Sequence, residues 1–279
     1  MSNSTYIFRR GRRAGVALVL ACSLVITGCG GSSGKPTAAD STRPGSSSSG
    51  PTPAPAPPEA CSEGAQAFWL PGPDGSKLEA NSIGSGPDAV VFLHEIGRRG
   101  MCGFDTYAQW LTTAYHVRAV LVNRCSYGVT TCRVAPREDE GIIAQTKPAV
   151  DWARAHGAKR VTLIGASGGG GDALQAAGAI PGIAAVVDLS GVVNDTGADD
   201  AASARRLRVP ILFAAAPGDP YCSLDDMRAL YRLVPSRPKR LVVVGGEPGT
   251  HGWDLMTDAN DKPTPLGRQV ASWVRGQLD

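Results

Sequence analysis

The stretch VTLIGASGGGGDA, Val161 to Ala173, decides the fold of this chain. It begins with an apolar, β-branched run, passes through Gly165-Ala166-Ser167-Gly168-Gly169 and continues into residues that favour a helix. Glycines adopt the backbone conformations that a sharp chain reversal requires. We therefore predict a strand, a tight turn and a helix in immediate succession.

The turn matches the pattern G-x-S-x-G, in which the flanking glycines let the serine hydroxyl stand clear of the sheet edge. Ser167 is accordingly the candidate nucleophile. Glycine-rich turns of this length also end ordinary strands. The assignment therefore depends on whether the chain supplies the partners that a reactive serine needs.

The same glycines allow a second interpretation. Gly165, Gly169 and Gly171 resemble the phosphate-binding turn of short-chain dehydrogenases, with Asp188 as the ribose partner. That family opens its domain with this turn and has a Tyr-x-x-x-Lys pair downstream, whereas no tyrosine after Ser167 is followed by such a lysine. The position of the motif thus argues against a nucleotide site, and we expect no cofactor.

The first 28 residues have the pattern of an export signal. Arginines at positions 9, 10, 12 and 13 precede an apolar core at 14–26, which is shorter than the ~20 residues that span a bilayer. The sequence Ile26-Thr27-Gly28-Cys29 resembles the lipobox of bacterial lipoproteins, so Cys29 is predicted to be acylated and to become the N-terminus. Ordinary cleavage nearby and export by the twin-arginine route are the alternatives.

Three segments follow from composition. Residues 1–28 are the predicted lipoprotein signal peptide, and residues 29–59 are the lipidated Cys29 with a linker rich in Gly, Ser, Pro and Ala. Such a linker is flexible in its Ser/Gly part and stiffer in its Pro-rich part. Residues 60–279 suit one folded domain, which we expect outside the cell and anchored to the bacterial cell membrane.

The net charge argues against two classes of partner, nucleic acids and anionic membrane surfaces. The chain has 28 basic and 25 acidic residues, and loss of the four signal arginines leaves 24 basic residues. The mature protein is thus close to neutral and has no basic run with interleaved aromatic residues. We expect no nucleic-acid partner, contact with the membrane only through the lipid anchor, and a monomer.

Cysteine usage indicates an oxidising environment. Cys22 leaves with the signal peptide and Cys29 takes the lipid, which leaves five cysteines for the domain: Cys61, Cys102, Cys125, Cys132 and Cys222. Five cysteines form at most two bridges. We predict one between Cys125 and Cys132, which would close a short loop. A metal site is the weaker interpretation, because no Cys-x-x-Cys or paired-histidine spacing occurs, and none is expected.

Strands and helices alternate along the domain. The predicted strands are 65–70, 77–83, 89–94, 117–123, 161–166, 184–189, 211–216 and 240–244, and the predicted helices are 107–114, 138–155, 169–178, 199–206, 223–233 and 265–277. Strands that are apolar throughout and separated by helices indicate a parallel sheet covered on both faces. The predicted fold class is therefore α/β, with a mostly parallel, eight-stranded sheet.

The chain supplies a base and an acid for Ser167. A serine hydroxyl is activated by a histidine that a carboxylate orients, and in sheets of this kind the chain order is serine, acid, histidine. Only His251 among the four histidines follows Ser167, in a glycine-flanked loop after the last strand. Asp219 lies just beyond the penultimate strand and is the predicted acid. Asp188, at the end of the preceding strand, is the alternative.

With these three residues in order, the chain resembles the α/β-hydrolase family from residue 65 to residue 279. After the third strand this family usually has His-Gly, and here His94-Glu95-Ile96-Gly97 stands at that place, with Glu95 replacing the glycine. The loop after the next strand commonly contains Asp-x-x-Gly-x-Gly-x-Ser in the family. Residues 123–130 are a loosened version of it.

The resemblance implies an exported serine hydrolase that cleaves an ester-type acyl bond through an acyl-serine. It also implies that the backbone N–H groups of Gly168 and Ile96 form the oxyanion hole, where one donor is worth about 3–4 kcal/mol. No residue discriminates ester from amide hydrolysis or perhydrolysis. A different class is also open: a surface-displayed binding protein without turnover, for which Glu95 and the cysteines are the hints.

Segment length predicts an uncovered site. Only residues 189–210 separate the strand that ends near Asp188 from the strand that begins near Ile211, and one crossover helix fills this segment. No sizeable cap domain fits. Ser167 should therefore lie in an open, shallow cleft walled by residues 97–105, 125–137 and 221–223, suited to small or surface-presented esters.

Overall fold

The computed structural model describes residues 58–97, 99–130, 132, 139–191, 200–245 and 249–278. The predicted signal peptide, the predicted lipidation site Cys29 and nearly all of the linker lie outside these residues. Among the helices of the described ranges, none is both long enough and apolar enough to cross a membrane.

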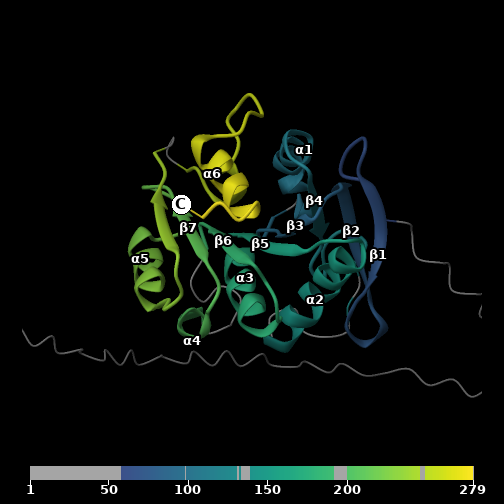
Figure 1. Ribbon diagram of the computed structural model, residues 1–279, viewed down its shortest axis with the longest axis horizontal. Helices are drawn as coiled ribbons and strands as arrows, with labels where there is room; N and C mark the ends of the chain where they lie inside the picture. The colour runs from purple at the N-terminus through teal and green to yellow at the C-terminus, as the bar shows by residue number, and fades with distance from the viewer. Residues whose placement is uncertain are drawn as a thin grey trace, which may run out of the picture. The chain divides into compact units, whose positions relative to one another are not determined.

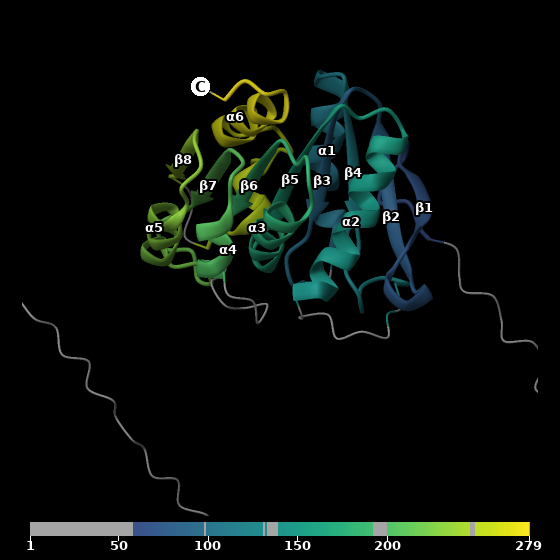
Figure 2. The same cartoon turned by 60° about the horizontal axis from the view of Figure 1, so that its bottom comes forward.

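Eight strands of the described residues form one sheet in the order β1-β2-β4-β3-β5-β6-β7-β8. Figure 2 shows them side by side, with β1 at one edge and β8 at the other. β2 runs antiparallel to β1 and β4, and all other neighbours are parallel. The strands are β1 Gln66–Pro71, β2 Lys77–Gly84, β3 Asp88–Leu93, β4 Val117–Val122, β5 Arg160–Ala166, β6 Ala185–Leu189, β7 Ile211–Ala215 and β8 Lys239–Val243. The predicted mostly parallel, eight-stranded sheet is thus confirmed.

Helices cover both faces of the sheet, as predicted. In Figure 1, α1 and α6 lie above the sheet, while α2, α3 and α4 lie below it. The helices are α1 Asp105–Ala114, α2 Asp139–Ala155, α3 Gly168–Ala179, α4 Asp200–Arg206, α5 Leu224–Leu233 and α6 Pro265–Val274, with short 3₁₀ segments η1 Pro73–Gly75, η2 Gly100–Phe104 and η3 Gly252–Leu255.

Two hydrophobic clusters, one on each face, explain why the central strands are apolar throughout. On β5, Leu163 belongs to the cluster under α2 and α3, whereas its neighbour Ile164 belongs to the cluster under α1 and α6. Successive strand residues point to opposite faces, so both must be apolar when both faces are covered. This packing holds the carboxyl ends of β3, β5, β6, β7 and β8 at one edge of the sheet.

The element ends differ from the prediction by at most three residues, and several coincide with it. The largest difference is at α6, which ends at Val274 because the chain leaves the helix at Gly276, where φ is +77°. The 3₁₀ segments were not predicted. Between β6 and β7 the described residues contain α4, and the described domain carries no large cap, as predicted.

Two disulfides form among the domain's cysteines. The predicted Cys125–Cys132 bridge is present, and a second bridge joins Cys61 to Cys102. The fifth cysteine, Cys222, is a buried free thiol, and burial raises its pKa well above the usual value. A thiol of this kind stays protonated and packs as a small apolar side chain.

Candidate active site

Ser167 occupies the sharp turn between β5 and α3. Its φ of 52° and ψ of −125° lie outside the regions that residues with a side chain normally adopt. The turn is held on both sides, because the Ser167 N–H donates to the carbonyl of Leu189 and the Ser167 carbonyl accepts from Gly170 N–H. A non-glycine residue kept in such a conformation by its surroundings is typical of a functional position.

Glycines make this turn possible because neighbouring backbones approach too closely for a Cβ. A Cβ at Gly165 would overlap the carbonyl of Gly169, and a Cβ at Gly169 would overlap the carbonyl of Leu93. The first turn of α3 therefore packs directly on the ends of β5 and β3. Gly168, the first residue of α3, has an N–H that needs no acceptor within the helix and is free to serve an oxyanion.

Asp219 and His251 form a hydrogen-bonded pair at the same edge of the sheet. Nδ1 of His251 lies 2.9 Å from both Oδ1 and Oδ2 of Asp219. The carboxylate is completely covered from solvent, and about a tenth of the imidazole is exposed. Because Nδ1–H donates to the carboxylate, Nε2 of the neutral ring is left as the acceptor.

The charge of Asp219 is stabilised by its surroundings. Burial alone would raise the pKa of this carboxyl, but hydrogen bonds from His251 and Ser190 and from the N–H groups of Tyr221 and Cys222 outweigh it, so its pKa lies below the ordinary value. The carboxylate therefore remains charged at neutral pH. The charged carboxylate thus holds the orientation and the tautomer of the His251 ring.

The segments that carry Ser167 and His251 pack against each other through their neighbours. Ala166 precedes Ser167 and Gly252 follows His251, and a Cβ added at Gly252 would lie 3.4 Å from Cβ of Ala166. Ser167 is 7% exposed and His251 is 9% exposed. Both residues are thus nearly buried where the segment of His251 and η3 reaches the carboxyl end of β5.

His94 orients the peptide that carries the second predicted oxyanion donor. Its Nε2 accepts the N–H of Arg124 at 3.0 Å, so Nδ1 carries the proton and donates to the Glu95 carbonyl at 2.7 Å. In a trans peptide the C=O and N–H bonds point in opposite directions. The bond to Glu95 therefore fixes the direction of the Ile96 N–H. Burial and the nearby Arg124 lower the pKa of His94 to about 3, which keeps the ring neutral.

Glu95, which replaces the glycine expected from the resemblance, lies beside the pair. Burial, the charge of Asp254 and the charge of Asp219 raise its pKa to about 7, against the opposing effects of the Trp253 N–H and Arg99. One of its oxygens, Oε2, would overlap a Cβ at Gly252, whose φ is +55°. Glycine at position 252 thus makes room for Glu95 next to His251.

Asp188, the alternative acid, lies apart from this pair. It is fully buried on β6, and its carboxyl faces Gly170 and Gly191, where a Cβ on either glycine would overlap Oδ1. Burial and the neighbouring Asp200 raise the pKa of Asp188 to about 8. Its carboxyl is therefore mostly protonated at neutral pH, whereas the partner of His251 must be charged.

The positions of two side chains in the predicted site segments could not be taken from the sequence. The ring of Tyr221, which is 70% exposed, packs edge-on against the His251 ring, with centroids 5.0 Å apart. Ile96 is also exposed, by 46%. The sequence placed Tyr221 in a predicted wall of the cleft and the N–H of Ile96 in the predicted oxyanion hole, but it did not indicate how these side chains lie. Tyr221 thus adds aromatic surface beside His251, the candidate base.

Comparison with solved structures assigns the fold. An esterase of Pyrococcus furiosus aligns with a TM-score of 0.63 and 13% identity over 77% of this chain and 93% of its own. Dienelactone hydrolase of Anabaena variabilis aligns with a TM-score of 0.59 and 20% identity over 77% of this chain and 100% of its own. Est1E of Butyrivibrio proteoclasticus, solved with ferulic acid, aligns with a TM-score of 0.59 and 14% identity over 75% of this chain and 97% of its own. No protein-family model and no curated protein sequence matches the chain. The chain has the α/β-hydrolase fold.

Proposed function

We propose that this protein is an exported serine hydrolase that cleaves carboxylic esters, with Ser167 as nucleophile, His251 as base and Asp219 as the orienting acid. The observation that carries the proposal is the Asp219–His251 hydrogen bond at the sheet edge where the strained Ser167 turn lies. The chain shares its fold with the esterase of Pyrococcus furiosus, and this likeness supports ester cleavage.

The reaction follows the usual two halves. Nε2 of His251 takes the proton of Ser167 while Oγ attacks the ester carbonyl, and the N–H groups of Gly168 and Ile96 stabilise the resulting oxyanion. The tetrahedral intermediate collapses, the C–O bond to the alcohol breaks, and His251 gives its proton to the leaving alcohol. Water then attacks the acyl-serine by the reverse sequence, which releases the acid and restores the Ser167 hydroxyl.

A fluorophosphonate probe tests the proposal. A reactive serine displaces fluoride and forms a stable P–O bond, so the labelled peptide should contain Ser167. Ser167→Ala should remove the label, whereas Ser85→Ala, at an exposed serine of the turn after β2, should retain it. Absence of labelling in correctly folded wild-type protein would favour the binding protein without turnover.

Anchoring at the cell membrane is part of the proposal and has a separate test. Two disulfides are consistent with a domain outside the reducing cytoplasm. Cys29→Ser should release the protein from the membrane fraction and leave ester hydrolysis unchanged. A wild-type protein that is soluble in the medium, with an N-terminus other than lipidated Cys29, would contradict the anchor.

A further inference from the structure

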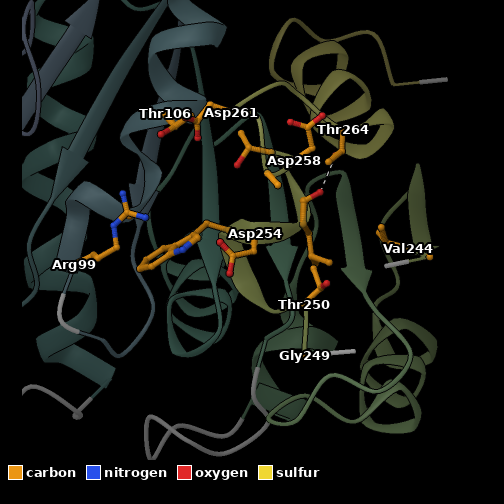
Figure 3. Close-up of a pocket in the computed structure, with 15 residues that line it drawn as sticks. Arg99, Thr106, Val244, Gly249, Thr250, Asp254, Asp258, Asp261 and Thr264 are labelled. Carbon is orange, nitrogen blue, oxygen red and sulfur yellow. Dashed lines mark hydrogen bonds between the residues drawn. The ribbon is translucent and has the colours of Figure 1, made fainter. Parts of the chain in front are cut away.

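A cleft of about 590 Å³ opens beside the candidate site. Its walls come from three segments that Figure 3 shows together: Arg99 and Thr106 near the start of α1, Thr250 and Asp254 after β8, and Asp258, Asp261 and Thr264 before α6. Its volume is within the range of pockets that hold a small organic molecule. Thr250 directly precedes His251, so one wall of the cleft is the segment that carries the proposed base.

Glu95 connects the cleft to the reacting groups. The charges of Asp254 and Arg99, which line the cleft, and the charge of Asp219, which binds His251, all act on the Glu95 carboxyl. A Cβ at Gly252 would overlap Oε2 of Glu95, so this side chain lies against the residue that separates His251 from Trp253, and Trp253 lines the cleft. In ester cleavage the leaving alcohol takes a proton from His251, so the alcohol lies on the histidine side of the scissile bond. The cleft is placed to hold that part of the substrate.

The charges around the cleft do not favour an ionic ligand. Asp258 already accepts the N–H groups of Asn260 and Lys262, both at 2.9 Å, and Lys262 and Arg268 are the cations that act on its carboxyl. Arg99 adds a cation at the opposite side. Arg99, Lys262 and Arg268 thus balance the three carboxylates of the lining, so the surroundings of the cleft favour neither a cationic nor an anionic alcohol.

The cleft is, in contrast, lined by many hydrogen-bonding groups, which include both donors and acceptors. The Arg99 guanidinium supplies donors, the Asp254 and Asp261 carboxylates supply acceptors, and the hydroxyls of Thr106 and Thr257 supply both. An alkyl group would strip water from these groups and return no hydrogen bond. Each alcoholic hydroxyl donates one hydrogen bond and accepts others, so a polyhydroxylated ligand matches this mixture of donors and acceptors.

We infer that this cleft binds the alcohol part of the substrate and that the substrate class is an acyl ester of a neutral, polyhydroxylated alcohol, such as an acylated sugar. The inference rests on the proposed function, because it assigns the leaving group of the same reaction. A site that hydrogen-bonds substrate hydroxyls discriminates strongly against analogues that lack them.

Two acetyl esters with the same ring size test this. Purified protein should hydrolyse glucose 6-acetate with a kcat/KM at least about tenfold above that for cyclohexylmethyl acetate, which lacks the hydroxyls. Asp254→Ala should lower the ratio of kcat/KM for glucose 6-acetate to that for p-nitrophenyl acetate by at least about tenfold. Asp151→Ala, at an exposed aspartate of α2 on the other face of the sheet, should leave the ratio unchanged.

The remaining outcomes separate the two proposals. Equal rates for the two ring esters, a ratio unaffected by Asp254→Ala, or a preference for acetylcholine would overturn the inference while p-nitrophenyl acetate hydrolysis still supports the esterase. No hydrolysis of any of these esters by folded protein would overturn the proposed function and the substrate class with it.

Discussion

His251 Nδ1 is equidistant, at 2.9 Å, from the two carboxylate oxygens of Asp219. This contact favours Asp219 over Asp188 as the acid of the proposed triad. Asp219→Asn should lower kcat by about 10³–10⁴-fold, because an amide can hold the ring in the wrong tautomer and cannot stabilise an imidazolium. Steady-state kinetics on an ester measure this directly.

Asp188→Asn is the matched control. The carboxyl of Asp188 is mostly protonated at neutral pH and faces glycine backbone, so an amide of the same shape should keep kcat within about tenfold of the wild type. If Asp188→Asn proves the damaging change and Asp219→Asn the mild one, Asp188 is the acid.

His94→Ala should lower kcat by about 10–100-fold, part of the 10²–10³-fold effect of one oxyanion donor, because the Glu95–Ile96 peptide loses the bond that fixes it. KM should change little, since the ground-state ester makes weaker use of that N–H. His94→Gln, which retains one donor and one acceptor, should recover most of the loss. A boronic acid, which forms a tetrahedral adduct with a serine, should bind more weakly to His94→Ala in proportion to the loss in kcat. Unchanged boronate affinity would show that His94 has only a structural role.

The strand, turn and helix around Ser167 were predictable from the sequence. Gly165 and Gly169 lie where neighbouring backbones leave no room for a Cβ, and glycines at this spacing can be recognised in a sequence. The sequence favoured Asp219 as the acid and left Asp188 open as the alternative. Asp188 lies on β6, and the register of this strand, with Asp188 opposite Gly165 and Phe213, places its side chain against α3.

Contacts between loops could not be predicted from the sequence either. The short Cys125–Cys132 loop indicated its own bridge, whereas the Cys61–Cys102 bridge depends on how the chain before β1 packs on η2, across 41 residues. The place of Glu95 beside His251 depends on the room left by Gly252. No local pattern specifies such long-range packing.

Asp188 should make stability depend on pH. Its folded-state pKa of about 8 lies above the unfolded value near 4, so the folded protein binds the extra proton between these values. Its contribution to stability is full below about pH 4 and is lost as pH rises through 8. The Tm of the wild type should therefore fall between pH 5 and pH 9, and the Tm of Asp188→Asn should fall less. We expect the two decreases to differ by at least about 5 °C. Parallel Tm curves for the two proteins would contradict the buried-acid argument.

The two disulfides should contribute unequally. In the chain-entropy model, closing the Cys125–Cys132 loop stabilises by about 2–3 kcal/mol, and closing the longer Cys61–Cys102 loop by about 4 kcal/mol. Cys61→Ser should therefore lower the free energy of unfolding more than Cys132→Ser does, as urea titrations can measure. Intact-mass analysis after alkylation should find one free thiol in the lipid-free domain. Five free thiols would exclude both bridges.

Acyl-chain preference depends on the absence of a large cap. In the described part of the domain, α4 is the element between β6 and β7, and no large cap covers the site. A long acyl chain would thus remain largely in water, where each CH₂ forgoes about 0.8 kcal/mol of binding. We expect kcat/KM for p-nitrophenyl acetate or butyrate to exceed that for palmitate by at least about tenfold, without a jump in rate when the substrate passes its solubility limit. A steep rise from acetate to palmitate would show that Ser167 opens into a covered apolar site and that the prediction from segment length is wrong.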